Sequence, residues 1–235
     1  KKKLEKLYPV VLESKLDGLT VVAYPKDGTS MFVTRGNGVE GEILPRFPSE
    51  YCGVNRSSYP IRGEAFLPKN YFESINEGRK DKFANERNAA SGILRRLDDN
   101  EYINYIKFIA YDVVGLDVSE DKKIKYIHEH TCFNTIEGEN VESNAEDKIE
   151  SFYKRNKMKN YPIDGVVIKS NTDCSLEKFG STRHHPLNAF AWKAEDEQHI
   201  TTLRKINWTV GRETITPVAE FDPVEIDGTV VKEAS

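Results

Sequence analysis

The sequence predicts an α+β fold that is rich in antiparallel sheet, and three observations support this. Short segments alternate apolar with polar residues and are rich in β-branched side chains, as strands are. Short turns such as Lys26-Asp27-Gly28 join neighbouring segments, which favours antiparallel pairing over a doubly wound sheet. Other segments are predicted to be helical, so the fold combines helices with antiparallel sheet.

The predicted elements follow one another along the chain. Strands are predicted at residues 10–15, 19–24, 31–35, 61–67, 108–114, 163–169 and 189–193. Helices are predicted at 69–77, 86–97, 121–128 and 145–156, and the acidic segment 137–147 is predicted to be a solvated loop. Three short strands at 206–210, 215–220 and 229–232 are predicted to begin a small β-barrel, which gives a first domain at 1–202 and a partial second domain at 203–235.

Composition limits the class of protein. The 235 residues are 38% hydrophobic and 31% charged, which suits a globular chain, and no run approaches the ~18 apolar residues that span a bilayer. The first residues lack the apolar stretch of a secretory signal, and three widely spaced cysteines form neither a disulfide framework nor a zinc motif. A cytoplasmic protein without a membrane partner is therefore expected. The net charge of −4 implies that any contact with nucleic acid is made by a local basic patch.

Lys15 is the candidate nucleophile. It ends an apolar run and is followed by Asp17 and Gly18, so a strand would present its amine on rigid backbone beside an anion. This short pattern also occurs by chance, and most lysines are solvated surface charges. Its weight therefore depends on the other motifs of the chain.

Two further segments carry polar side chains in or after predicted strands. Arg35 precedes Gly36 at a strand end, where it fits a contact to a nucleotide's ribose or phosphate, or equally a hairpin turn. Glu64 lies in a short strand, where its carboxylate faces either solvent or the hydroxyls and metal of a ligand.

A predicted helix carries two arginines on one face. Arg87 and Arg95 are eight residues apart, with alanine, serine and glycine between them. Two guanidinium groups above small residues suit a phosphate backbone. A helix that packs through its alanines, with its arginines in solvent, explains the pattern about as well.

Two late strands carry lysines. In the strand at 163–169, alternation predicts that Asp164 faces one side and Lys169 the other, and the last predicted strand ends at Lys193. Two lysines brought to one pocket would neutralise a polyphosphate. For each strand alone, one lysine extending to solvent is the simpler interpretation.

Taken together and in order, these segments resemble the adenylation (nucleotidyltransferase) domain of the NAD+-dependent DNA ligases, over nearly the whole chain. The lysine motif and the 163–169 strand are shared with other covalent nucleotidyltransferases, whereas the segment from Phe83-Ala84-Asn85 to Arg95 is characteristic of the NAD+ branch. The resemblance implies a covalent nucleotidyltransferase (ATP-grasp-like ligase) fold, followed by the start of an OB-fold.

The resemblance also implies a mechanism. Lys15 attacks the α-phosphate of NAD+, releases nicotinamide mononucleotide (NMN) and holds AMP as a phosphoramidate. AMP then passes to the 5′-phosphate of nicked double-stranded DNA, and the 3′-hydroxyl displaces it to seal the strand.

The family's nucleotide contacts can be transferred to matching positions. By this resemblance Glu13 and Lys169 contact the adenine, and Tyr111 stacks on it. Arg35 and Glu64 approach the ribose.

The remaining transferred roles concern phosphates, metal and DNA. Lys193 contacts the nucleotide phosphate, while Asp17 and Asp164 orient the nucleophile and a hydrated Mg2+ (or Mn2+), with Asp164 as the metal contact. Arg87 and Arg95 engage DNA phosphates.

The sequence also departs from the family. It does not match the N-terminal module that captures the nicotinamide half of NAD+, nor the zinc-binding, helix-hairpin-helix and BRCT regions. It is therefore expected to be a monomeric fragment that holds AMP but does not seal nicks alone.

Two alternatives stay open. An ATP-dependent ligase or RNA-capping relative would use the same lysine with a nucleoside triphosphate. A non-catalytic nucleotide- or nucleic-acid-binding module would keep the fold without turnover. The joint presence of five polar residues argues against that second alternative: Lys15, Glu64, Asp164, Lys169 and Lys193.

Overall fold

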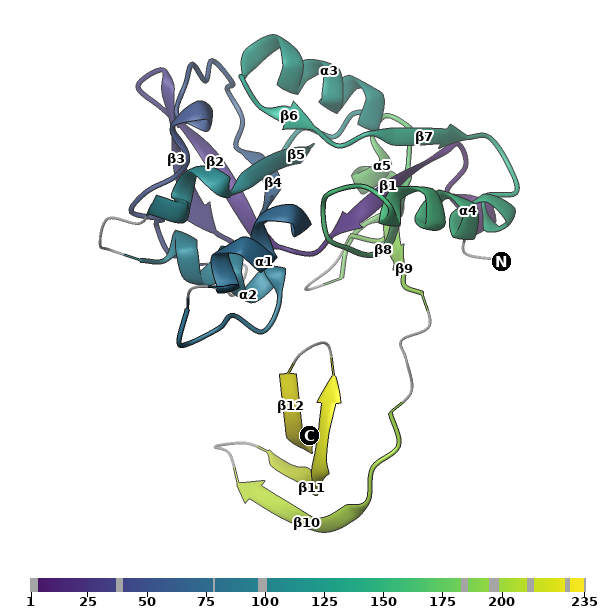
Figure 1. Cartoon of the computed structure of the whole chain (residues 1–235). Helices are drawn as coiled ribbons and strands as arrows, with labels where there is room; N and C mark the ends of the chain where they lie inside the picture. Colours follow the sequence, from purple (N-terminus) through teal and green to yellow (C-terminus); the bar gives the residue numbers. More distant parts are fainter. Residues whose placement is uncertain are drawn as a thin grey trace. The chain divides into compact units, whose positions relative to one another are not determined.

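The computed structural model describes residues 4–36, 40–77, 79–96, 101–182, 186–194, 199–210, 214–226 and 229–234. The chain forms two compact units, Lys1–Ala194 and Glu195–Ser235 (Figure 1). In the part of the chain that is described, no helix is long and apolar enough to cross a membrane.

A four-stranded antiparallel sheet carries the N-terminal strand of the first unit. Its order is β7-β1-β8-β9, so the purple strand β1 in Figure 1 lies between strands that come much later in the sequence. One face of β1 and β8 is apolar and packs against helix α4. The strands are β1 (Val10–Leu16), β7 (Gly138–Val141), β8 (Ile163–Ser170) and β9 (Ala189–Trp192).

A five-stranded sheet with the order β3-β2-β4-β5-β6 forms the other half of this unit. Its pairs are antiparallel except β5 with β6. The predicted turn between β2 and β3 is confirmed: Asp27 and Gly28 both have positive φ, 49° and 78°, as a tight hairpin requires. The strands are β2 (Leu19–Lys26), β3 (Thr29–Thr34), β4 (Ile61–Phe66), β5 (Lys107–Val113) and β6 (Asn134–Thr135).

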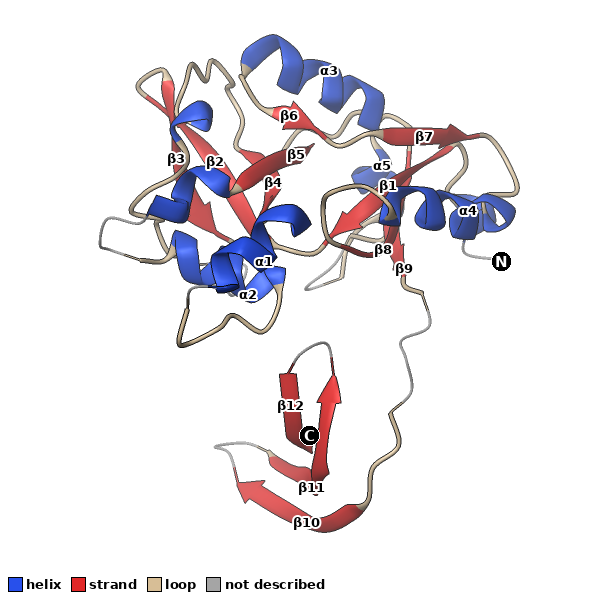
Figure 2. Ribbon diagram, viewed as in Figure 1, coloured by secondary structure: helices blue, strands red, loops and turns tan. Residues whose placement is uncertain are grey.

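Helices cover the two sheets (Figure 2). Helices α1 and α2 contact each other, α2 also contacts β2 and β4, and α3 lies along β5 and β6. Helix α4 contacts β1 and β8. The helices are α1 (Lys69–Glu77), α2 (Glu86–Leu94), α3 (Glu120–His130), α4 (Glu146–Lys157) and α5 (Ser175–Phe179), with 3-10 turns at Leu4–Lys6, Ser49–Tyr51 and Glu101–Tyr105.

A small apolar cluster links the two sheets. Leu16 at the end of β1, Phe66 at the end of β4 and Ile136 are buried together, and Tyr111 of β5 packs against them. This contact holds the β1 end beside β4 and β5, where the predicted site residues lie.

The second unit is a three-stranded antiparallel sheet of β10 (Leu203–Val210), β11 (Ile215–Ile226) and β12 (Thr229–Ala234). It contains the three strands predicted for this tail. Three strands do not close a barrel, so the OB-fold stays a prediction.

The α+β prediction is confirmed, and each strand and helix predicted in the first unit is present within a few residues. Helix α2 ends at Leu94 rather than at residue 97, which lies outside the described residues. The prediction of a solvated loop at 137–147 was wrong. Gly138–Val141 form β7, which pairs with β1, and α4 begins at Glu146. Polar side chains hid this short edge strand, because its backbone pairing leaves no alternating apolar pattern.

Candidate functional site

Lys15 lies near the end of β1, beside a β-bulge in the neighbouring strand β8. Its amine donates to both carboxylate oxygens of Asp164 at 2.7 Å, and Lys193 Nζ lies 3.1 Å from Asp164 Oδ2. The side chains of Lys15 and Asp164 are 28% and 25% exposed, so the amine is anchored but open to solvent. We call Lys15, Asp164 and Lys193 the lysine cluster.

A β-bulge brings Asp164 to Lys15. Lys15 pairs with Gly165 but Leu16 pairs with Ile163, so Asp164 is an extra residue in β8. Alternation had predicted Asp164 on the opposite face from Lys169. That prediction was wrong. A bulge adds one residue to the strand, so the strict alternation of faces does not continue across it.

The residues after Lys15 contact helix α2. The Asp17 carboxylate accepts a hydrogen bond from Arg87 at 2.9 Å, whereas the carboxylate bonded to Lys15 is that of Asp164. Gly18 permits a close approach of the same segment to β4, since a Cβ there would lie 2.3 Å from the carbonyl oxygen of Ala65.

Helix α2 is fixed at both ends. Asn85 caps it by accepting from the backbone N–H of Asn88 at 2.8 Å. Arg95 follows its last turn and lies 3.5 Å from Glu42. The side chains of Arg87 and Arg95 are 58% and 51% exposed, and each guanidinium group is paired with a carboxylate.

Glu64 and Arg35 are brought together on the five-stranded sheet. Thr20 of β2 pairs with Glu64 of β4, and the backbone N–H of Arg35 donates to the Thr20 carbonyl at 3.2 Å. The Thr20 hydroxyl also donates to the Glu64 carboxylate at 3.1 Å. Burial raises the pKa of Glu64 to about 7, against the opposing charges of Arg87 and Lys15. Asn37 and Gly38, which follow Arg35 and Gly36 in the sequence, lie outside the described residues.

Six charged side chains of alternating sign form a row that begins two residues before Lys15 on β1, and we call this row the charge chain. Each member forms an ion pair with the next, over distances of 2.7 to 3.1 Å. Its members come from β1, β8, α3, β5 and β4. In order they are Glu13, Lys169, Glu120, Lys123, Asp112 and Arg62.

The buried end of the charge chain is Glu13 with Lys169. Burial raises the pKa of Glu13 to about 7 against the charge of Lys169, and Glu120 adds to the rise. Although burial disfavours its charge, the carboxylates of Glu13 and Glu120 hold the pKa of Lys169 above its ordinary value. Glu13 and Lys15 are two residues apart on β1, so they share a face about 7 Å apart.

Tyr111 lies over Lys169. The Lys169 ammonium is 5.4 Å from the centre of the Tyr111 ring and donates to the Tyr111 carbonyl at 2.9 Å. Burial raises the pKa of the Tyr111 hydroxyl, and the charge of Glu64 adds to the rise. The hydroxyl therefore stays protonated, and the charged groups near it are Glu64, Arg62 and Lys169.

The sequence prediction missed Glu120, Lys123, Asp112 and Arg62. Asp112 gave the one available signal, because it is a carboxylate in an otherwise apolar strand and so needs a buried partner. Glu120 and Lys123 lie on a polar helix, where charged residues are ordinarily solvated.

The donor atoms around Asp164 determine whether it can contact a metal ion directly. Among the described residues no three histidine, cysteine, aspartate or glutamate side chains come together to hold a metal ion. Both oxygens of Asp164 carry lysine ammonium groups. These residues do not fit a directly bound Mg2+.

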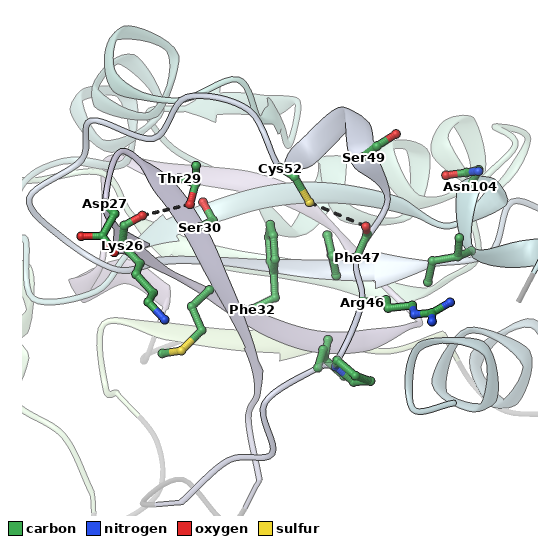
Figure 3. Close-up of a pocket in the computed structure, with 14 residues that line it drawn as sticks. Lys26, Asp27, Thr29, Ser30, Phe32, Arg46, Phe47, Ser49, Cys52 and Asn104 are labelled. Carbon is green, nitrogen blue, oxygen red and sulfur yellow. Dashed lines mark hydrogen bonds between the residues drawn. The ribbon is translucent and has the colours of Figure 1, made fainter. Parts of the chain in front are cut away.

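One pocket lies away from these residues, between the β2–β3 hairpin and the segment before β4 (Figure 3). It has a volume of about 720 Å³, and Phe32 and Phe47 stack at its base with ring centres 3.8 Å apart. The dashed lines mark hydrogen bonds from the Thr29 hydroxyl to the Lys26 carbonyl and from the Cys52 thiol to the Phe47 carbonyl. Its described lining contains none of the predicted site residues.

Comparison with solved structures supports the fold. One structure, from a structure-function study of Lig E DNA ligases, superimposes with a TM-score of 0.57 at 15% identity and covers 96% of this chain and 77% of its own. A second, named Pmar-Lig_PreS3, gives 0.58 at 14% identity and covers 96% and 52%.

Sequence comparison identifies the family. DNA ligases of Brachyspira hyodysenteriae and Anoxybacillus flavithermus are each 35% identical to this chain, over 94% and 96% of it. The chain spans 36% of the length of each. The model of the NAD-dependent DNA ligase adenylation domain matches residues 1–197. The chain therefore belongs to the NAD-dependent DNA ligase adenylation domain family.

Proposed function

We propose that this chain takes AMP from NAD+ onto Lys15 and that the protein uses this adenylate to seal nicked double-stranded DNA. The observation that carries the proposal is the lysine cluster. A half-buried amine is held by one carboxylate, with a second ammonium group 3.1 Å from that carboxylate. Such an arrangement presents a nucleophile beside a positive charge that can meet a phosphate.

The chemistry follows from the positions of these groups. The Lys15 amine, after losing a proton, forms a P–N bond to the α-phosphorus of NAD+ as the P–O bond to NMN breaks. Asp164 holds the amine in line, since it accepts from Lys15 at 2.7 Å through both oxygens. Lys193 then faces the phosphate charge, and Asp17 acts through Arg87 on the approach of α2.

The nucleoside would lie over β1, between the lysine cluster and the buried end of the charge chain. Glu13 and Lys169 would meet the base edge, because they lie on the same face of β1 and β8 as Lys15, and Tyr111 of β5 would lie against the face of the base. The Arg35–Thr20–Glu64 row lies beside it and suits the ribose hydroxyls.

In the later steps a DNA 5′-phosphate oxygen attacks the adenylate phosphorus and releases Lys15, and the 3′-hydroxyl then displaces AMP. Arg87 and Arg95 would exchange their carboxylate partners for DNA phosphates. A divalent cation would enter with the substrate phosphates and its own water, since the donor atoms here do not bind it directly. A cytoplasmic monomer that meets DNA in the nucleoid fits this proposal.

The test is intact-mass analysis of the full-length protein after incubation with NAD+ and Mg2+, and separately with ATP and Mg2+. We expect the added mass of one AMP with NAD+ alone, and its complete loss in Lys15→Ala. The control is Lys154→Ala, which removes an exposed lysine from α4.

The other outcomes are equally informative. An adduct with ATP alone would assign the chain to an ATP-using nucleotidyltransferase. An adduct that persists in Lys15→Ala would overturn the assignment of the nucleophile. No adduct with either nucleotide would favour a module that only binds.

A further inference from the structure

The charge chain uses every hydrogen of the Lys169 ammonium group. Lys169 Nζ lies 2.7 Å from Glu13 Oε2, 2.9 Å from the Tyr111 carbonyl oxygen and 3.0 Å from Glu120 Oε2. These partners come from β1, β5 and α3. Three partners on three elements fix the ammonium position more tightly than a single carboxylate would.

Glu120 is itself held from behind. Its other carboxylate oxygen accepts from Lys123 at 2.9 Å, and Lys123 also donates to Asp112 at 2.9 Å. The side chains of Glu120 and Lys123 are only 4% and 5% exposed. Buried charges are tolerated when each has an opposite partner, and the six charges of the chain sum to zero. Glu120 therefore has little freedom to move.

A base that accepts a hydrogen bond from Lys169 must replace one of the three present partners of its ammonium group. Glu13 is the partner that the base replaces. Glu120 is tied to a second lysine, and the Tyr111 carbonyl belongs to the backbone of β5. Glu13 lies on the same face of β1 as Lys15. Once Glu13 turns to the base, Glu120 is the carboxylate that still compensates the Lys169 charge in the interior.

The order of donor and acceptor decides which purine fits. Adenine presents an amino donor at position 6 next to a ring-nitrogen acceptor, whereas a 6-oxopurine presents an acceptor at position 6. Glu13 as acceptor and Lys169 as donor match adenine only while Lys169 stays on its own side. If the ammonium were free to follow Glu13, the pair could meet a 6-oxo group instead.

We propose that Glu120 is a positioning residue that determines base specificity: by anchoring Lys169 it makes the site accept a 6-aminopurine and reject a 6-oxopurine. This inference rests on the proposed function, in which Glu13 and Lys169 meet the base. Glu120 acts through Lys169 and does not touch the nucleotide. Lys123 and Asp112 serve the same purpose one step further away.

The pH dependence of binding gives a readout that a merely structural role would not move. Glu13 accepts from the amino group only as a carboxylate, and the charged groups around it are Lys169, Glu120 and Asp112. Because Glu120 raises the pKa of Glu13, its removal lets Glu13 ionise at lower pH. AMP affinity falls as pH falls through the pKa of Glu13, so the midpoint of that fall moves to lower pH in Glu120→Gln.

The experiment is calorimetric titration of the chain with AMP and with inosine monophosphate (IMP), from pH 5.5 to pH 8.5. We expect the wild type to bind AMP at least ~10-fold more tightly than IMP. In Glu120→Gln this ratio should fall to below ~3-fold, with the pH midpoint for AMP moved down. Glu150→Gln, on the exposed face of α4, is the matched control and should change neither.

A second variant guards against misfolding. Glu120→Gln leaves Lys123 with one carboxylate fewer, whereas Glu120→Gln combined with Lys123→Gln removes one charge of each sign and keeps the remaining charges balanced. Thermal unfolding establishes that each variant is folded. The double variant should show the same loss of the AMP-to-IMP ratio.

Each remaining outcome overturns the inference. An unchanged ratio in a folded variant, or an equal loss of AMP and IMP with the ratio and pH midpoint retained, would leave Glu120 with a structural role only. If the wild type binds no AMP and forms no lysyl-AMP, the proposed function fails and the inference fails with it. If the wild type prefers AMP over IMP and Glu120→Gln keeps the same preference, the inference fails while the proposed function stands.

Discussion

The lysine cluster and the charge chain start from the same two strands but are built in opposite ways. Lys15 and Asp164 are about a quarter exposed and Lys193 is 55% exposed. At the other site Glu13 and Glu120 are each 4% exposed. The difference suits two tasks: an amine that must react with one molecule after another needs access, whereas a pair that reads a base edge needs fixed positions.

The largest effect is expected from breaking the buried site. Lys123→Met leaves Glu120 and Asp112 with one cation fewer, and removing one partner from a buried ion pair costs about 3–5 kcal/mol of unfolding free energy. Urea unfolding measures this. Lys154→Met, which breaks the exposed Lys154–Glu150 pair, is the control and should produce no measurable change. Equal effects of the two substitutions would contradict the comparison.

A substitution in the lysine cluster should lower the adenylation rate and leave the unfolding free energy nearly unchanged. Asp164→Asn removes the charge that orients Lys15 and Lys193, and a misplaced nucleophile costs about 100-fold in the adenylation rate. The unfolding free energy should stay near that of the wild type. Quenched time courses followed by intact mass give the rate, with Asp173→Asn, an exposed partner of Lys122, as the control. A loss of stability without a loss of rate would reverse the roles of the two sites.

Two buried carboxyls predict how stability depends on pH. The pKa values of Glu13 and Glu64 rise from 4.5 to about 7, so the folded chain binds protons that the unfolded chain releases between these pH values. Stability should therefore fall as pH rises from 4.5 to 7, by about 1 kcal/mol per pH unit for each group at most. The charge of Lys123 holds the pKa of Asp112 below its ordinary value despite burial, so Asp112 titrates below this window.

Glu64→Gln tests the pH prediction. Urea unfolding at several pH values should give a shallower slope in this variant, with the Glu13 part remaining. A wild-type stability that rises between pH 4.5 and 7 would show that these carboxyls are not buried as described.

The smallest effect concerns the brace between helix α2 and the lysine motif. Asn85→Ala removes the cap of α2 and should cost about 1 kcal/mol of unfolding free energy. Because the described contact between α2 and the lysine motif is the Arg87–Asp17 pair, the preference for AMP over IMP should not change. Asn85→Ser, which restores a capping oxygen, is the matched control. A changed base preference in Asn85→Ala would show that helix α2 influences the charge chain, which would contradict the comparison.

Local patterns predicted most of the elements. Strands β1, β2, β4, β5 and β8 carry enough apolar alternation to be identified, and the turn at Asp27-Gly28 carries its own signal. Strand β7 was missed, because it is polar and owes its form to pairing with β1.

The lysine cluster was predictable in membership but not in geometry. Lys15, Asp164 and Lys193 each stand in a recognisable motif, yet the face of Asp164 was assigned wrongly because of the bulge. The charge chain was predictable only at Glu13 and Lys169. Its other members come from α3, β5 and β4, and no local pattern connects them.

The sequence by itself determined the α+β class, the order of the elements, the family resemblance and the candidate nucleophile, because each depends on short patterns that hydrophobic periodicity and residue chemistry make legible. Only the tertiary structure decided which carboxylate meets Lys15 and which one anchors Lys169. Asp164 and Lys15 are 149 residues apart in the chain, and Glu120 and Lys169 are 49 apart. Pairings over such distances depend on strand register, a bulge and helix packing, which are properties of the whole fold.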